Sequence, residues 1–303
     1  MSPTQPKRRK YLRNGDRWVT TEEVVFCRLW FEFLIFSPSY ELARKHRAGT
    51  LTDADRARLP ADFTDVLAVY DDLGDIQRIE FDDWWQDRGI QLFGYQGETP
   101  RIGPIDVLVR ENPAKLETLI VRADEYIKGR WHRQGEQPAA ILAIPLGLSK
   151  AQISLQLDHL LSLYDDDLKE IKSEPPKYGL HGRKRDTKSL LRYMKCLLVK
   201  AQFPELRLYQ IGAIAELSST YSSRFEEEED IEDRHALKIL TSRAISRGLM
   251  IAENAARGIF PSYTRNEHTV APNWEEMCRV IDSRGDWLDG LEEDNFNHES
   301  MPQ

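Results

Sequence analysis

VVFCRLWFEFLIF, residues 24–36, is an apolar run around which we expect the fold of this 303-residue chain to assemble. The preceding TTEE, residues 20–23, offers a threonine cap and places two glutamates in the first turn of a helix, where carboxylates favour the positive end of the helix dipole. Apolar side chains nearly surround this helix, so we expect it to be central in its domain. Arg28 and Glu32 interrupt the run, which is also too short to cross a membrane.

The segments that follow residue 36 have helical patterns separated by turn residues. SPS at 37–39 ends the first helix, YELARKHRAG (40–49) predicts a second, and TDADRARLPADF (52–63) predicts a short helix and a proline corner. VLAVYDDLGD (66–75) continues helically to a glycine. This part of the chain is therefore expected to be an acidic helical domain.

FDDWWQDRGIQLFG, residues 81–94, contains two adjacent tryptophans behind two aspartates. On a helix that begins near Phe81, the side chains of Phe81, Trp84 and Trp85 share one face, and the aspartates point toward water. A platform that stacks nucleic-acid bases would want basic neighbours, whereas these are acidic. We therefore expect the tryptophans to pack in the core.

From about residue 100 the pattern changes to short runs rich in branched side chains. IDVLVR (105–110), ETLIV (117–121) and AAILAIPL (139–146) predict strands, and a helix capped by Ser149 follows. No glycine array precedes that helix, so a phosphate-cradling loop is not expected.

These patterns predict a predominantly helical α+β protein with a small strand-containing region after its acidic helical N-terminal domain, and then a helical C-terminal domain. The expected divisions are a basic flexible tail (1–19), the acidic helical domain (20–100), a small α/β region (101–170), a linker with two prolines (171–182), a helical domain (183–265) and an acidic tail (266–303).

The net charge of −8 argues against a protein that coats nucleic acid with its whole surface. Positive charge is nevertheless gathered in two places, residues 7–17 and 177–200. Negative charge is concentrated at 53–87, in EEEEDIED (226–233) and in the C-terminal tail. An anionic partner is therefore expected to meet only part of the molecule.

RKRDTKSLLRYMKCLLVKAQF, residues 183–203, predicts an amphipathic helix capped by Asp186 or Thr187. Its apolar stripe consists of Leu190, Met194, Leu197, Leu198 and Ala201. The opposite side carries only positive charge, which is unusual because solvated faces commonly mix signs. Phosphates offset the repulsion between like charges. The candidate nucleic-acid-binding residues, for DNA or RNA, are Lys184, Lys188, Arg192 and Lys195, with Arg8, Arg9 and Lys10 of the tail.

A second interpretation of the same helix involves no nucleic acid. Its positive side can pair with an acidic protein partner, as in a protein-interaction component of a bacterial complex, or with acidic segments of its own chain. LRLYQIGAIAEL (206–217) and the helix after it have some character of a helix-turn-helix motif. Their connection, STYSSRFEEEED (219–230), is far longer than the three or four residues of that motif.

No motif in the sequence indicates catalysis. The three cysteines lie far apart, the seven histidines are scattered, and neither an HExxH nor a GxSxG motif is present. We assign no catalytic residue, metal ligand or cofactor, and expect a reducing cytoplasmic location. A nuclease is a third alternative, and its candidate residues are Asp106, Glu111 and Lys115. These residues lack the close spacing of acidic residues and lysine that is typical of such enzymes.

FSPSYELARKHRAG, LPADFTDVLAVYDDLGD and FDDWWQDRGIQLFG together resemble a group of uncharacterised bacterial cytoplasmic proteins. The resemblance covers about the first third of the chain. It implies a bacterial, intracellular origin and supplies no activity and no functional residues.

Overall fold

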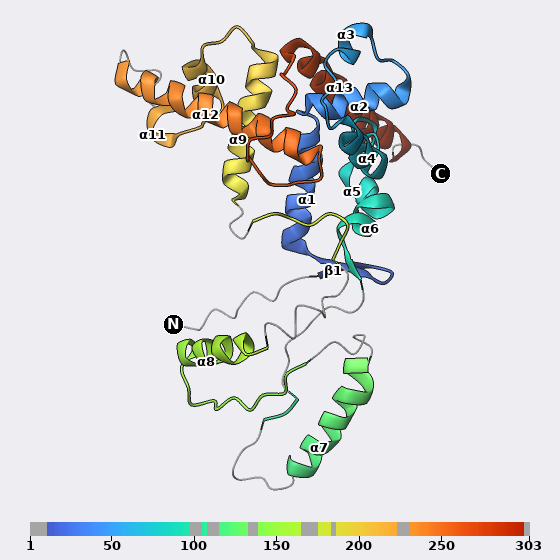
Figure 1. Cartoon of the computed structure of the whole chain (residues 1–303), viewed down its shortest axis with the longest axis vertical. Coiled ribbons are helices and arrows are strands. Elements are labelled where there is room, and N and C mark those ends of the chain that lie inside the picture. The colour runs from blue at the N-terminus through green and yellow to red at the C-terminus, as the bar shows by residue number, and fades with distance from the viewer. Residues whose placement is uncertain are drawn as a thin grey trace. The chain divides into compact units, whose positions relative to one another are not determined.

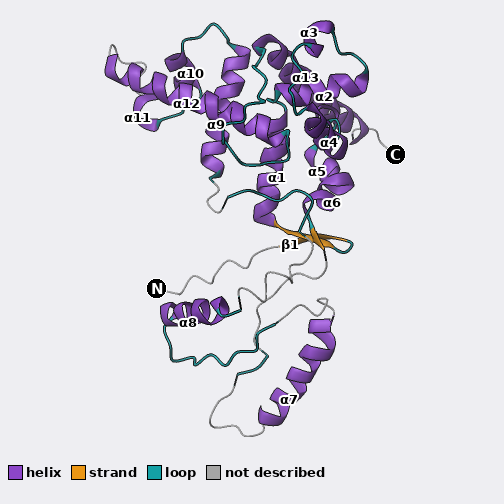
Figure 2. Cartoon of the chain, in the orientation of Figure 1, coloured by secondary structure: helices purple, strands orange, loops and turns teal. Residues whose placement is uncertain are grey.

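The structure, a computed structural model, describes residues 11–96, 105–107, 115–132, 139–164, 175–182, 186–222 and 231–299 (Figure 1). The chain forms two compact units. Unit 1 comprises Met1–Thr20 and Gly94–Lys177, and unit 2 comprises Thr21–Phe93 and Tyr178–Gln303. Helices predominate and the strands form one small antiparallel sheet (Figure 2), so the predicted mainly helical α+β class is confirmed.

Unit 1 contains the sheet. Its strands, in spatial order, are β1 (Tyr11–Asn14), β2 (Arg17–Thr20) and β3 (Tyr95–Gln96). A two-residue turn joins β1 to β2, and its Gly15 has a φ of 58°, a conformation that glycine adopts without strain. Trp18 stacks on Tyr95 with ring centroids 4.7 Å apart. The hairpin occupies positions that the sequence analysis assigned to a flexible tail.

The described parts of unit 1 do not form the predicted strands. Residues 117–121 lie within α7 (Lys115–Glu125), which continues as the π-helix η3 (Tyr126–Trp131). Residues 139–146 form no strand, nor do residues 105–107, while 108–110 lie outside the described residues. The branched run at 118–121 is flanked by strong helix formers, whose propensity prevails over a local strand preference. The Ser149 cap is confirmed, because its side chain accepts from Gln152 N at the start of α8 (Lys150–Ser162).

The first part of unit 2 follows the predicted helices closely. Its elements are α1 (Thr21–Leu34), α2 (Pro38–Ala48), α3 (Asp53–Arg56), α4 (Phe63–Leu73), η1 (Ile76–Arg78), α5 (Phe81–Trp84), η2 (Trp85–Gly89) and α6 (Ile90–Phe93). The predicted break at residues 37–39 is an N-cap, since Ser37 accepts from Tyr40 N and Pro38 begins α2. Gly49 ends α2 with a φ of 69°.

The paired tryptophans belong to the core, as the sequence predicts. Phe81, Trp84 and Trp85 are buried, whereas Asp82 and Asp83 are exposed. The ring of Phe31 on α1 lies 5.0 Å from that of Trp84. Trp84 Nε1 donates to Leu73 O at 2.7 Å, which satisfies its polar atom.

The second part of unit 2 consists of α9 (Thr187–Gln202), α10 (Leu208–Ile214), α11 (Ser219–Ser222), α12 (Ile231–Ala255) and α13 (Trp274–Glu299). The first and second parts share one core, in which α1 packs against α12 (Figure 1). Trp30 Nε1 donates to Ala255 O at 3.1 Å, and its ring stacks on Phe260. Residues 21–93 and the described residues of 186–265, which the sequence analysis separated, therefore belong to one unit with a shared core.

Helix α13 lies in the segment that the sequence analysis described as an acidic tail. Met277, Val280 and Arg284 on this helix are buried. The Arg284 guanidinium donates to the carbonyl of Ile76 in η1. Among the described residues, no helix is long and apolar enough to cross a membrane.

Candidate nucleic-acid interface

Helix α9 begins and packs as predicted. Asp186 is its N-cap, and its carboxylate accepts from Lys188 N at 3.0 Å and from Ser189 Oγ at 2.6 Å. The Ser189 hydrogen bond is the main cause that lowers the pKa of the Asp186 carboxyl, and the charge of Arg192 adds to it. Of the predicted apolar stripe, Leu190, Leu197 and Ala201 are buried and Met194 and Leu198 are half-buried.

Lys188, Arg192 and Lys195, which we call the basic row, are exposed on the other side of α9. No described carboxylate forms an ion pair with Lys188 or Arg192. Lys195 Nζ lies 3.6 Å from Glu216 Oε2, and both side chains are more than half exposed. Such an exposed pair contributes about 0–1 kcal/mol, so Glu216 holds Lys195 only weakly.

Part of the predicted interface lies outside the described residues. Lys184, Arg8, Arg9 and Lys10 lie outside the described residues, and so do residues 226–230 of the acidic run. The basic row is therefore the part of the predicted interface that the structure brings together.

A contact chain that the sequence did not predict joins α9 to the loop after α12. Tyr193 on α9 accepts a hydrogen bond of 3.1 Å from Arg247 Nη1 on α12, and the Arg247 guanidinium lies 5.0 Å from the ring centroid of Tyr263. We call Tyr193, Arg247 and Tyr263 the Arg247 bridge. The close approach of the helices depends on Gly248, where a Cβ atom would lie 2.9 Å from Leu197 Cδ1.

A buried ion network fixes the same loop. Arg257 at the end of α12 donates to both carboxylate oxygens of Asp62, at 2.6 and 3.0 Å, and to Glu253 Oε2 at 3.0 Å. Glu253 also accepts from Ser37 Oγ and Ser39 Oγ. Burial opposes ionisation of Asp62, but the hydrogen bonds and charge of Arg257 outweigh it and hold the pKa of Asp62 below its ordinary value. With both carboxylates and the guanidinium partnered, this network is structural.

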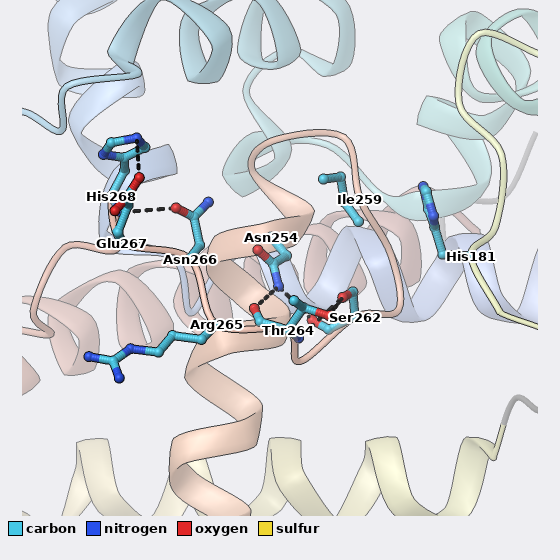
Figure 3. A pocket seen from close by; sticks show the side chains of 9 residues that line it. All are labelled: His181, Asn254, Ile259, Ser262, Thr264, Arg265, Asn266, Glu267 and His268. Carbon is cyan, nitrogen blue, oxygen red and sulfur yellow. Dashed lines mark hydrogen bonds and ion pairs between the residues drawn. The ribbon is translucent and has the colours of Figure 1, made fainter.

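Residues of the loop that follows α12 line an open cavity, and Figure 3 shows their side chains. We call it the loop cavity, and its volume is about 820 Å³. The lining residues are His181, Asn254, Ile259, Ser262, Thr264, Arg265, Asn266, Glu267 and His268. The cavity is largely open to solvent rather than enclosed.

The described residues offer little for covalent or metal chemistry. They contain no group of three histidine, cysteine or acidic side chains that could hold a metal ion. Burial raises the pKa of the Cys196 thiol to about 12, so this thiol stays protonated at neutral pH and is a poor nucleophile. Of the nuclease candidates, Asp106 lies 3.0 Å from Arg122 Nη1, and Glu111 lies outside the described residues.

Comparison of the chain with protein-family models, with curated proteins and with solved structures found no match.

Proposed function

We propose that the chain associates with nucleic acid without catalysing a reaction on it. In this proposal the basic row contacts phosphates in the bacterial cytoplasm. Further contacts come from Lys184, Arg8, Arg9 and Lys10.

The exposure of the basic row carries the proposal. Lys188, Arg192 and Lys195 face water on a helix whose other side is buried. Among the described residues, no carboxylate forms an ion pair with Lys188 or Arg192. Seven residues of helix rise about 10 Å. That length covers about three phosphates of one strand, which are about 3.4 Å apart along a duplex axis. Binding there releases condensed counterions and relieves the repulsion between the cations.

A second candidate function is a protein-interaction component. The observation that favours it lies in unit 1, where α8 has no buried residue. Leu146, Leu155 and Leu163 are each more than two thirds exposed. A set of exposed apolar side chains is typical of a surface that another protein covers. This candidate predicts a protein partner and no affinity for nucleic acid at low salt.

Charge reversal of the basic row separates the two candidates. The variant Lys188→Glu/Arg192→Glu/Lys195→Glu should bind DNA and RNA much more weakly than the unaltered chain. The slope of log affinity against log salt should fall by about two to three, because each lost phosphate contact removes about 0.7 to 0.9 from it. Fluorescence anisotropy with labelled oligonucleotides over a range of salt concentrations measures both quantities.

A matched control makes the same change of charge elsewhere. Arg56, Lys150 and Arg279 are exposed and lie outside the basic row. Their replacement by glutamate should leave most of the salt slope in place. Equal loss in both variants would mean that net charge alone governs binding, and unchanged binding in the basic-row variant would contradict the proposal.

A further inference from the structure

Helix α12 carries a second surface with charges of one sign. Between residues 234 and 247 it presents Lys238, Arg243 and Arg247, all exposed, and this stretch contains no acidic residue. Glu232 and Asp233 precede it in the first turn of α12, where carboxylates favour the positive end of the helix dipole. A positive face without acidic residues is unusual in a chain with a net charge of −8, because solvated surfaces commonly mix signs.

These cations lie on the side of α12 that faces away from the core. On the opposite side, Leu237, Thr241 and Ala244 are each at most 2 % exposed, and α12 packs against both α9 and α10. At 100° per residue, Ser242 and Ser246 fall between Lys238 and Arg243 around the helix. Both serines are exposed. The outer side of α12 therefore combines cations with hydroxyl groups.

The contacts of the basic residues on α12 differ. Arg257 belongs to the buried ion network, and the Arg234 guanidinium lies 5.7 Å from the ring centroid of Tyr209. Arg247 contacts only tyrosines in the Arg247 bridge, which leaves its charge uncompensated. No carboxylate of a described residue forms an ion pair with Lys238, Arg243 or Arg247. Their charges are therefore available to an anion.

The chemistry of this surface suits a chain of phosphates. A guanidinium donates through a fork of N–H groups that matches phosphate oxygens, and serine hydroxyls are common donors to the nucleic-acid backbone. From Lys238 to Arg247 the helix rises about 14 Å. That length covers about four phosphates of one strand, so each cation can meet a phosphate of its own.

We propose that the outer side of α12, which we call the α12 face, is a second phosphate-contacting surface for nucleic acid. Its residues are Lys238, Ser242, Arg243, Ser246 and Arg247. This inference rests on the proposed function and extends the contact from one helix to two. Helices α9 and α12 pack against each other within unit 2 (Figure 1), so one core holds both surfaces. Phosphate contacts carry no sequence information, so the α12 face adds affinity without preference for a sequence.

Charge reversal of two residues tests the α12 face. In the variant Lys238→Glu/Arg243→Glu, the slope of log affinity against log salt should fall by about one to two, because each lost phosphate contact removes about 0.7 to 0.9 from it. Fluorescence anisotropy with labelled DNA over a range of salt concentrations measures the slope, and thermal melting checks the fold. The variant Lys238→Gln/Arg243→Gln removes the charges without adding acidic residues, so it tests the same loss if the glutamate variant unfolds.

A matched control and a combined variant complete the test. Arg56→Glu/Arg279→Glu makes the same change of charge at exposed positions on α3 and α13 of unit 2, and it should keep most of the slope. The combination of Lys238→Glu/Arg243→Glu with charge reversal of the basic row should lower the slope by the sum of the two separate effects, because the two surfaces contact different phosphates.

The outcomes separate this inference from the proposed function. If the α12 variant keeps the slope of its control while charge reversal of the basic row lowers it, the inference is overturned and the proposed function stands. The α12 face would then be left to another partner, such as an acidic protein surface. If only the α12 variant loses slope, the inference stands and the proposed role of the basic row is overturned. Absence of nucleic-acid binding by the unaltered chain at low salt overturns both.

Discussion

Two arginines of this chain make the same forked contact with an aspartate in different surroundings. The side chain of Arg257 is 5 % exposed where it meets Asp62, whereas that of Arg47 is 46 % exposed where it meets Asp71. Water already solvates the exposed pair and leaves it little net value. Water does not solvate the buried guanidinium of Arg257 in the same way. This guanidinium also donates to the main-chain carbonyls of Glu253 and His268.

Arg257→Lys should therefore lower the free energy of unfolding by at least about 2 kcal/mol, because lysine keeps the charge but cannot donate in several fixed directions. Arg47→Lys, the matched exposed change, should alter it by less than about 0.5 kcal/mol. Urea denaturation followed by circular dichroism measures both. Similar values for the two variants would show that the buried network does not stabilise the loop.

At the scale of elements, glycine permits a close helix contact in unit 2. A Cβ atom at Gly212 on α10 would overlap Thr241 Oγ1 on α12 and lie 3.0 Å from Leu237 Cδ1. Thr241 is fully buried, and its hydroxyl donates to Leu237 O at 2.8 Å. A methyl group at residue 212 would therefore displace this hydroxyl and break its hydrogen bond.

Gly212→Ala should destabilise the protein by about 1–3 kcal/mol, as overpacking of a core does. Gly285→Ala on α13 should have the opposite sign and stabilise by about 0.5–1 kcal/mol, because nothing lies within 4 Å of a Cβ atom there and alanine favours a helix. Chemical denaturation of the two variants checks the difference in sign. Stabilisation by both changes would mean that α10 and α12 do not pack as closely as described.

Helices with local caps and a clear apolar stripe could be predicted from the sequence. Asp186, Ser149 and Gly49 each act within one turn of their own position, so their effect is visible in a short window. The strand predictions at 117–121 and 139–146 failed because a branched run has no fixed structure without a partner strand. The hairpin at 11–20 turns at Gly15 and Asp16, and a glycine in the first position suits a two-residue turn, but its surrounding charge favoured a tail.

The candidate interface, too, could be predicted only in part from the sequence. The basic row lies on one helix and follows from helical spacing. The Arg247 bridge and the loop cavity join α9 and the segment before it to α12 and the loop after α12, and their residues are up to 87 positions apart, from His181 to His268. Contacts of that range depend on packing, which periodicity within one helix does not encode.

For the whole molecule, the middle of the chain behaves as an insertion into unit 2. Tyr178 N donates to Leu92 O at 3.0 Å, so the two points at which unit 2 is interrupted lie side by side. The core of unit 2 joins residues on both sides of the interruption, as Trp30 does with Ala255 and Phe260. Removal of residues 94–177 therefore takes away no described contact within that core.

A protein in which residues 21–93 are fused to 178–303 by a short glycine-serine linker should fold by itself, since a linker of about four residues spans about 13 Å. It should give a helical circular dichroism spectrum and one cooperative thermal transition. The same fusion carrying Trp30→Ala should lose about 3–5 kcal/mol of stability, because the change empties the centre of the shared core. A fusion that is helical but melts without a cooperative transition would show that unit 2 needs residues of unit 1 (1–20 or 94–177) to fold, and the insertion interpretation would then be wrong.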